Sequence, residues 1–481
     1  MPSLHLPTLR RRRLRFLAAA GLAGCLAPGW LRAQPAPAAD DPWLQPLVEY
    51  TRPAAGSDLP ASEQQLEQIL SLAATKSPAM IQQGDSVDQA DAAQFRSWMR
   101  HTPVITASYS FGMFYQATGT TGGSLTPGGT LTIQASQPLW HWGAFDAQTN
   151  LGLLRERLAQ NEAILTYSKL CLDVRKRYYD LVVLKAKHAT FAGEIAAAQR
   201  VLDHERLLFQ QGRSTAQLVN SDAVALDKLH AQEGKTAGDF TFQLNEFRRI
   251  TGSGTFSGDD VPDHIFLPVV DDPGLQTQFE AAQKSRLGGS PLAAEQDLNG
   301  RILDQQLIIS RASRRPQLDL SASVSQTPYI NSANNGLKFG TLFFIGLTGT
   351  WTLWDRGSSV AQDSALLAQK HQVETQYADL ITQTQNDAAN SLSQMDAGVR
   401  LLANLKKQYL LQQGDYRQAH TLIGLGRGDQ TQLDTARNAL LDTRLEILTE
   451  QAAITESYYS YISDIFQDPA LANAPPFTQP R

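Results

Sequence analysis

Two regions of the chain alternate apolar and polar residues, which is the pattern of a strand with one apolar and one polar face. Ile105, Tyr109 and Phe111 alternate with threonine, serine and glycine, and residues 131–135 continue the pattern after a turn-rich loop. The later stretches 318–324 and 339–351 alternate in the same way. We therefore predict two strand hairpins, whose strands cover about residues 103–115, 129–139, 316–328 and 339–354.

After each predicted strand hairpin, the spacing of the apolar residues becomes that of long helices. No proline occurs from residue 139 to 261 or from 329 to 468, and an internal proline is what breaks a helix. Apolar residues recur every seven positions in these stretches, and this spacing makes paired helices supercoil. One such series is Leu151, Leu158, Leu165, Leu172 and Tyr179. We predict long helices over about 144–211, 215–250, 357–423 and 430–466, with glycine-containing turns between the members of each pair.

Landmarks that recur at one offset indicate an internal repeat. Pro78 and Pro291 lie 213 positions apart, and Gly212 and Gly426 lie 214 apart. We interpret the body of the chain as one unit written twice. The predicted domains are a first repeat over 62–260, a linker over 261–274, a second repeat over 275–466 and a C-terminal tail over 467–481.

The first 33 residues are typical of an export signal. Four arginines at 10–13 precede an apolar run at 16–22 that is too short to span a bilayer. Two cleavage sites compete, one before Cys25, as in bacterial lipoproteins, and one after Ala33. The Arg12-Arg13 pair also leaves twin-arginine export open. Residues 34–61 then form an N-terminal extension.

Charge and composition narrow the classes of function. The formal net charge is −5, and cleavage after Ala33 would remove six arginines and no acidic residue, leaving −11. An acidic chain argues against a nucleic-acid partner. Two cysteines exclude a disulfide framework, and the histidines lack metal-site spacing. The glycine-rich stretch 424–428 joins two helices rather than following a strand, so it is no nucleotide loop. We expect no catalytic residues, no cofactor and no metal.

Four amphipathic strands are too few to close a barrel in a membrane, which takes at least about eight. An open sheet would leave strand edges without hydrogen-bond partners in lipid. Several copies of the chain therefore have to pool their strands into one barrel. The long helices, which follow the strands directly, would extend that barrel as a tube, and such an oligomer would be a conduit.

The doubled order of helix, Ser-Pro, helix, proline, two strands and a long helical hairpin resembles that of the TolC-like outer-membrane efflux protein family. The turns at 212–215 and 426–429 resemble the family's hairpin tips, and the resemblance covers about residues 62–466. It implies a mainly α fold with a membrane β-barrel part, in which three duplicated chains form a twelve-stranded barrel continuous with a periplasmic α-helical barrel. It also implies a homotrimer in the outer-membrane lipid, docked to a periplasmic adaptor and an inner-membrane pump. Residues 24–28 resemble the start of lipidated members, with Cys25 as the lipidation candidate.

The candidate site residues lie near the two turns. The candidates for a periplasmic gate are Asp434, Asp222, Asp429, Arg427 and Arg437. Three copies of Asp434 would form a carboxylate ring if that helix face lined the tube, with Arg427 or Arg437 as partners. The alternative is an exposed aspartate that the helix dipole favours. The residues expected to reverse the chain and to contact the adaptor are Gly212, Arg213, Gly424, Gly426 and Gly428. The family usually has an aspartate six residues after the tip glycine, where this chain has Leu218.

These observations favour a channel subunit, the exit duct of a tripartite efflux pump or a type I secretion system. Transport through it would be passive, from the periplasm or the pump to the exterior. The alternative is a structural periplasmic coiled-coil protein without transport. A protein that needs detergent for extraction would favour the channel, and a freely soluble rod would favour the alternative.

Overall fold

The structure is a computed structural model, and it describes residues 61–117, 123–268, 272–331 and 336–478. The predicted signal peptide at 1–33, the lipidation candidate Cys25 and the predicted extension up to residue 60 lie outside these ranges. The described residues all belong to one compact unit of the chain.

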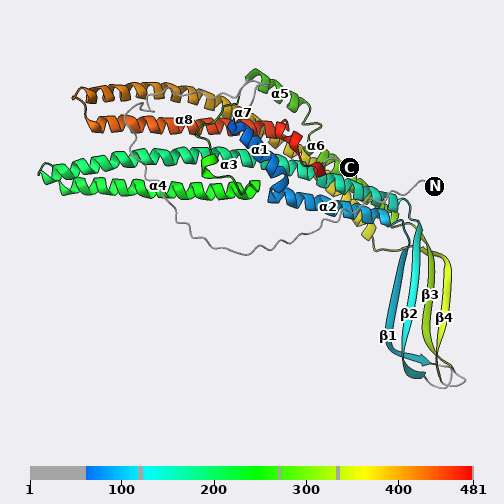
Figure 1. The fold of residues 1–481 in the computed structure, drawn as a ribbon. Coiled ribbons are helices and arrows are strands. Elements are labelled where there is room, and N and C mark those ends of the chain that lie inside the picture. Colours follow the sequence, from blue (N-terminus) through cyan, green and yellow to red (C-terminus); the bar gives the residue numbers. More distant parts are fainter. Residues whose placement is uncertain (1–60, 118–122, 269–271, 332–335, 479–481) are drawn as a thin grey trace. The chain divides into compact units, whose positions relative to one another are not determined.

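The described chain is mainly helical with a few antiparallel strands, and this part of the predicted fold class is confirmed. An order of two shorter helices, two strands and two longer helices occurs twice (Figure 1). The first set is α1 (Ala61–Lys76), α2 (Pro78–Met99), β1 (Val104–Ala117), β2 (Gly123–Trp140), α3 (Ala144–Gln210) and α4 (Ala216–Thr251). The second set is α5 (Asp272–Lys284), α6 (Pro291–Ala312), β3 (Gln317–Asn331), β4 (Gly336–Thr350), α7 (Ser358–Gly424) and α8 (Gln430–Asp464). Short 3-10 helices are η2 (Gly258–Asp260), η3 (Pro469–Asn473) and η4 (Pro476–Thr478).

The four strands form one antiparallel sheet in the order β1-β2-β3-β4 (Figure 1). The central pair, β2 and β3, joins the two sets of elements, and Ala135 for example lies opposite Ala322. Within the described chain, β1 and β4 are therefore edge strands, each with one side that pairs with no other strand.

Strand β2 begins earlier than the sequence pattern predicts. The glycine- and proline-containing stretch before residue 129 looks like a loop, yet it continues the ladder with β1, where Pro127 lies opposite Met113. The pairing of β2 with β3 starts only at Leu131. Pro127 therefore has a neighbouring strand on one side only, where a missing N–H group is tolerated.

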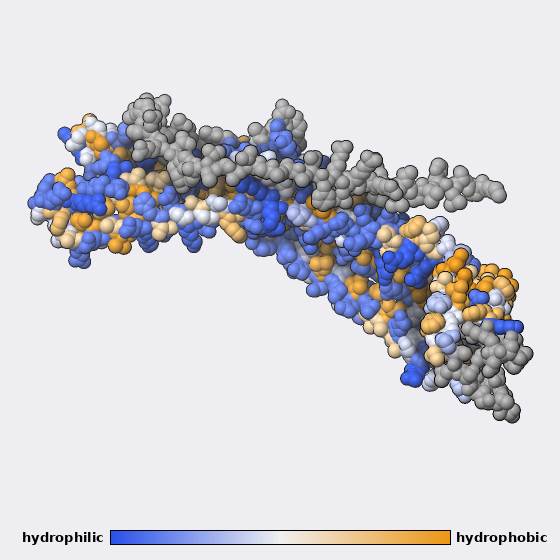
Figure 2. All heavy atoms as spheres, turned by 60° about the horizontal axis from the view of Figure 1, so that its bottom comes forward, coloured by the Kyte–Doolittle hydropathy of each residue, from blue (hydrophilic) through white to orange (hydrophobic). Residues whose placement is uncertain are grey.

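Apolar side chains of the sheet are left uncovered by the rest of the chain. Ile105 and Phe111 of β1 are each 72% exposed, and Phe343 and Ile345 of β4 are 74% and 80% exposed. Figure 2 shows hydrophobic residues gathered over the strands, whereas the surface of the long helices is largely hydrophilic. On β4 the exposed apolar residues also include Phe344, which lies between Phe343 and Ile345 and so on the opposite face.

Each strand-to-helix junction contains two successive residues with positive φ. Trp142 (55°) and Gly143 (79°) precede α3, and Arg356 (57°) and Gly357 (80°) precede α7. Residues other than glycine rarely adopt a positive φ, so contacts with the surroundings have to stabilise the backbone at Trp142 and Arg356. At the first junction, the Trp142 indole Nε1–H donates a hydrogen bond to the Pro316 carbonyl oxygen at 2.7 Å.

The long helices form two antiparallel hairpins, α3 with α4 and α7 with α8 (Figure 1). Helices α3 and α7 have 67 residues each. At the tips, Gly212 and Gly426 both have a φ of 70°, which suits glycine. The following helices begin with side-chain caps, in which Thr215 accepts from the Leu218 N–H and Asp429 accepts from the Thr431 N–H. Within the described ranges, no helix is both long enough and apolar enough to cross a bilayer.

The main core lies around the middle of α3. Its buried Tyr167, Tyr178 and Leu181 cluster with apolar residues of α1, α4 and α8. The segment after α8 closes this core, because the guanidinium of Arg175 donates hydrogen bonds to the carboxylate of Asp468. Both members of this ion pair are buried.

Candidate functional site

Helices α3 and α8 form the contact between the two hairpins, which we call the hairpin seam. They run antiparallel, so residues near the end of α3 meet residues near the start of α8. The Arg200 side chain contacts Asp434 near the tips, and the hydroxyls of Ser168 and Ser463 lie 3.2 Å apart at the other end. The seam thus brings together residues separated by more than 230 positions in the chain.

Asp434 is a buried member of the seam rather than an exposed helix residue. Its two carboxylate oxygens accept hydrogen bonds from the Arg200 guanidinium, from Nε at 3.0 Å and from Nη2 at 2.6 Å. These bonds raise the pKa of Arg200 above its ordinary value. The sequence predicts Arg427 or Arg437 as a partner of Asp434, whereas within this chain Arg200 of the other hairpin forms the pair.

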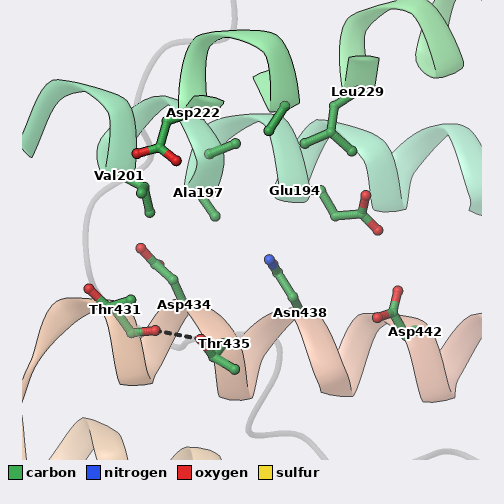
Figure 3. Close-up of a pocket in the computed structure, with 12 residues that line it drawn as sticks. Glu194, Ala197, Val201, Asp222, Leu229, Thr431, Asp434, Thr435, Asn438 and Asp442 are labelled. Atoms are coloured by element: carbon green, nitrogen blue, oxygen red, sulfur yellow. Dashed lines mark hydrogen bonds between the residues drawn. The ribbon is translucent and has the colours of Figure 1, made fainter. Parts of the chain in front are cut away.

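A cavity of about 460 Å³ lies along the seam between α3, α4 and α8. Figure 3 shows Glu194 of α3 and Asp222 of α4 on one side, with Asp434, Asn438 and Asp442 of α8 on the other. The remaining lining residues are small, apolar or hydroxyl-bearing: Ala197, Ala198, Val201, Ala225, Leu229, Thr431 and Thr435. The cavity therefore unites two of the predicted gate residues, Asp434 and Asp222.

The other predicted charged residues lie outside the cavity lining. Asp429 is exposed and caps the first turn of α8, with its carboxylate 3.1 Å from the Thr431 nitrogen. Arg427 and Arg213 are exposed at the two tips, and Arg437 is half-buried on α8.

The predicted tip glycines do not share one role. Gly212 and Gly426 hold the positive φ values of the turns. Gly424 is the last residue of α7. Gly428 is needed for close approach, because a Cβ atom there would lie 2.5 Å from the backbone nitrogen of Ile423.

Arg200, Glu194 and Asp442 are site residues that the sequence pattern does not predict. Glu194 and Asp442 face each other across the seam (Figure 3), and burial raises the pKa of both carboxyls. No spacing in the sequence marks these residues, because their partners lie more than 200 positions away. The arrangement offers paired charges between two helical hairpins. Within the described ranges, no group of three or more His, Cys, Asp or Glu side chains is placed to hold a metal ion.

Comparison with known proteins gives matches at the level of structure. No family model and no curated protein matches the chain. The outer membrane protein VceC from Vibrio cholerae has 15% sequence identity and a TM-score of 0.61, over 84% of this chain and 96% of VceC. The CmeC outer membrane channel of Campylobacter jejuni has 13% identity and a TM-score of 0.64, over 85% of this chain and 86% of CmeC. The open state of the Neisseria gonorrhoeae MtrE outer membrane channel has 13% identity and a TM-score of 0.59, over 83% of this chain and 88% of MtrE.

The chain has the fold of TolC-family outer-membrane efflux channels. The doubled order of elements predicts this fold, and the prediction is confirmed over most of the chain. At these identities the likeness carries no side-chain role from one protein to another.

Proposed function

We propose that the chain is a subunit of an outer-membrane channel, the exit duct of a tripartite efflux pump or a type I secretion system. It catalyses no reaction, and it conducts substrates passively from the periplasm or the pump to the exterior. The observation that carries this proposal is a sheet with an uncovered apolar face, joined directly to helices of 67 residues. The likeness in fold to outer membrane channels supports it.

The sheet supports assembly as a homotrimer. Its edge strands β1 and β4 have 14 and 15 residues, and lipid does not tolerate unpaired edges of this kind. Pairing β1 of one copy with β4 of the next satisfies both edges. Three copies of a four-stranded sheet then give a closed barrel of twelve strands.

The helices support a periplasmic tunnel. We propose that the two sets of elements are duplicated halves, since their order and the length of their longest helix agree. At 1.5 Å per residue, helices α3 and α7 extend about 100 Å from the sheet. Their tips, including Gly212, Arg213, Gly424, Gly426 and Gly428, would then meet a periplasmic adaptor and the inner-membrane pump.

The gate belongs at the tips, and we place Asp434 in it. Its bidentate pair with Arg200 holds the start of α8 against α3, and Asp222 faces the same cavity. Asp429, Arg427 and Arg437 are further gate candidates on the same tip. Residues 1–33 remain a predicted signal peptide, and Cys25 a predicted lipidation site.

Two measurements test the channel against a structural coiled-coil protein. Native mass spectrometry of the detergent-extracted protein should give a trimer, and the trimer should conduct ions in planar bilayers. A soluble monomer without conductance would instead support the structural protein. In the same recordings, Asp434→Asn should alter cation selectivity or the closed-state conductance, because it weakens the pair with Arg200. Unchanged recordings would remove Asp434 from the gate.

A further inference from the structure

The hairpin seam carries pairs of like charge as well as the Arg200–Asp434 ion pair. Glu194 of α3 faces Asp442 of α8 across the cavity (Figure 3). Further from the tips, Lys176 of α3 lies 3.9 Å from Glu456 of α8, and Asp180 lies one helical turn after Lys176 on the same face of α3. Two carboxylates placed together repel each other unless one of them keeps a proton. The seam between the hairpins therefore has a charge that depends on pH.

The pair nearest the tips lies at the edge of the cavity. Figure 3 shows the carboxyls of Glu194 and Asp442 directed toward each other from α3 and α8. Besides this pair, the charged residues that line the cavity are Asp222 of α4 and Asp434 of α8. The guanidinium of Arg200 is bound to Asp434 through two hydrogen bonds.

On its other side, α8 packs against α7. The Gln408 amide of α7 donates to the hydroxyl of Thr443, the neighbour of Asp442, at 3.3 Å. Burial raises the pKa of Tyr409 on α7, and the positive charge of Arg444 on α8 lowers it in part. Desolvation raises the pKa of Glu194, and the charge of Asp442 raises it further.

The second pair lies further from the tips. Desolvation, followed by the charge of Asp180, raises the pKa of Glu456 to about 7. Lys176 opposes this shift, but its Nζ lies 3.9 Å from the carboxylate and its side chain is 60% exposed. Burial raises the pKa of Asp180, whereas the charges of Lys176 and Arg177 on its own helix lower it and that of Asp173 raises it. On the α7 side, Ser457, the neighbour of Glu456, donates a hydrogen bond to the Gln394 side chain at 3.5 Å.

We propose that the hairpin seam is a proton-operated latch, in which Glu194–Asp442 and Asp180–Glu456 hold the two hairpins together while each pair shares a proton. Loss of these protons places four carboxylates along one helix contact. Their repulsion then separates α8 from α3 and leaves Arg200–Asp434 to hold the tips alone. The inference rests on the proposed channel, because it makes the width of the tip depend on the acidity around it.

The direction of the pH dependence follows from linkage. The paired carboxyls bind protons more tightly with the hairpins docked than with them separated. Docking is therefore strongest at acidic pH and weakens as pH rises toward and through about 7, the value for Glu456. Each proton taken up on docking changes the docking constant by about tenfold per pH unit in this interval.

The latch is tested by a distance measurement that does not depend on transport. Spin labels at Gln217→Cys on α4 and Gln432→Cys on α8, both exposed sites near the tips, report the separation of the hairpins in the full chain purified in detergent. Cys25→Ala removes one native thiol, and Cys171 is fully buried. Between pH 5.5 and 8 we expect the short-distance population to give way to a longer one. Below about pH 7, the value for Glu456, the ratio of the two should change by up to about tenfold per pH unit for each proton, and it should level off above that pH.

Amide variants imitate the protonated pairs and keep the side-chain shape. Glu194→Gln with Asp442→Asn should reduce the pH slope by one proton, and adding Glu456→Gln should leave the short distance at every pH. Asp464→Asn is the matched control: burial and the charge of Asp387 raise the pKa of Asp464 to about 7 as well, but that pair lies inside the second hairpin. It should keep the wild-type response.

Three results would overturn the latch. The first is a distance distribution that stays constant from pH 5.5 to 8. The second is a wild-type response in the triple amide variant. The third is separation at pH 5.5 on addition of EDTA, which would mean that a bound cation, rather than a proton, holds the carboxylates. A protein that lacks conductance but shows the predicted distances would contradict the channel and not the latch.

Discussion

The two long hairpins have matching lengths but very different surroundings. Helix α3 packs against α1, α2, α4, α6 and α8, whereas α7 packs mainly against α8 and α6. Leu181 in the middle of α3 has no exposed surface, and Leu411 of α7 is 72% exposed. The other helices of the chain thus cover the first hairpin, whereas one side of the second hairpin stays exposed. In the proposed trimer, the neighbouring copy would cover that side.

The largest expected effect comes from the ion pair that anchors α3, which has no buried counterpart on α7 among the residues that the structure describes. Asp468→Ala leaves the buried Arg175 without its carboxylate, and an uncompensated buried charge costs about 3–5 kcal/mol. Denaturant unfolding followed by circular dichroism should show a loss of this size. Asp203→Ala, which removes an exposed partner of Arg206 on the same helix, should change stability by less than about 0.5 kcal/mol. Equal losses would mean that the C-terminal segment does not anchor α3.

A matched pair of leucines tests the difference in burial directly. Leu181→Ala creates a cavity in the core and should destabilise the chain by about 2–5 kcal/mol. Leu411→Ala should change the unfolding of the dissociated chain by less than about 0.5 kcal/mol. It should, however, lower the fraction of trimer on dilution, as measured by native mass spectrometry. A trimer that resists dilution as the wild type does would show that this part of α7 is not covered by another copy.

The ion pair across the hairpin seam should contribute an intermediate amount to the free energy of unfolding. Arg200 and Asp434 form charge-assisted hydrogen bonds, but the Arg200 side chain is 41% exposed, so the solvent screens part of the interaction. A double-mutant cycle with Arg200→Met and Asp434→Ala should give a coupling free energy of about 1–3 kcal/mol. A coupling near zero would mean that the hairpins meet without this pair.

The smallest expected effect concerns the tip glycines, which have the same backbone conformation in both hairpins. Gly212 and Gly426 have the same φ of 70°, and a Cβ atom meets no neighbour at either position. The substitutions Gly212→Ala and Gly426→Ala should therefore each lower the free energy of unfolding by about 1–2 kcal/mol through backbone strain, and the two losses should be equal. Unequal losses in thermal unfolding would show that one tip is supported by contacts that the other lacks.

Local patterns in the sequence predicted the elements well because their causes are local. Alternation at residues 105–113 and 318–324 marked strands, and the absence of proline from 139 to 261 marked the long helices. The prediction differed from the structure where pairing overrides local preference. Residues 123–128 extend β2 although they contain a proline, because the ladder with β1 continues through them.

The sequence by itself also singled out Asp434, but from its distance to a tip and not from its contacts. Only the tertiary structure paired it with Arg200, 234 positions earlier, and set Glu194 against Asp442. Helical periodicity determines which residues share a face of one helix, and it contains no information on which distant helix covers that face. That choice depends on the packing of α3 against α8, which arises only when both hairpins are folded. The sequence therefore determined the lengths and order of the elements, and the tertiary structure decided the partners of their charges.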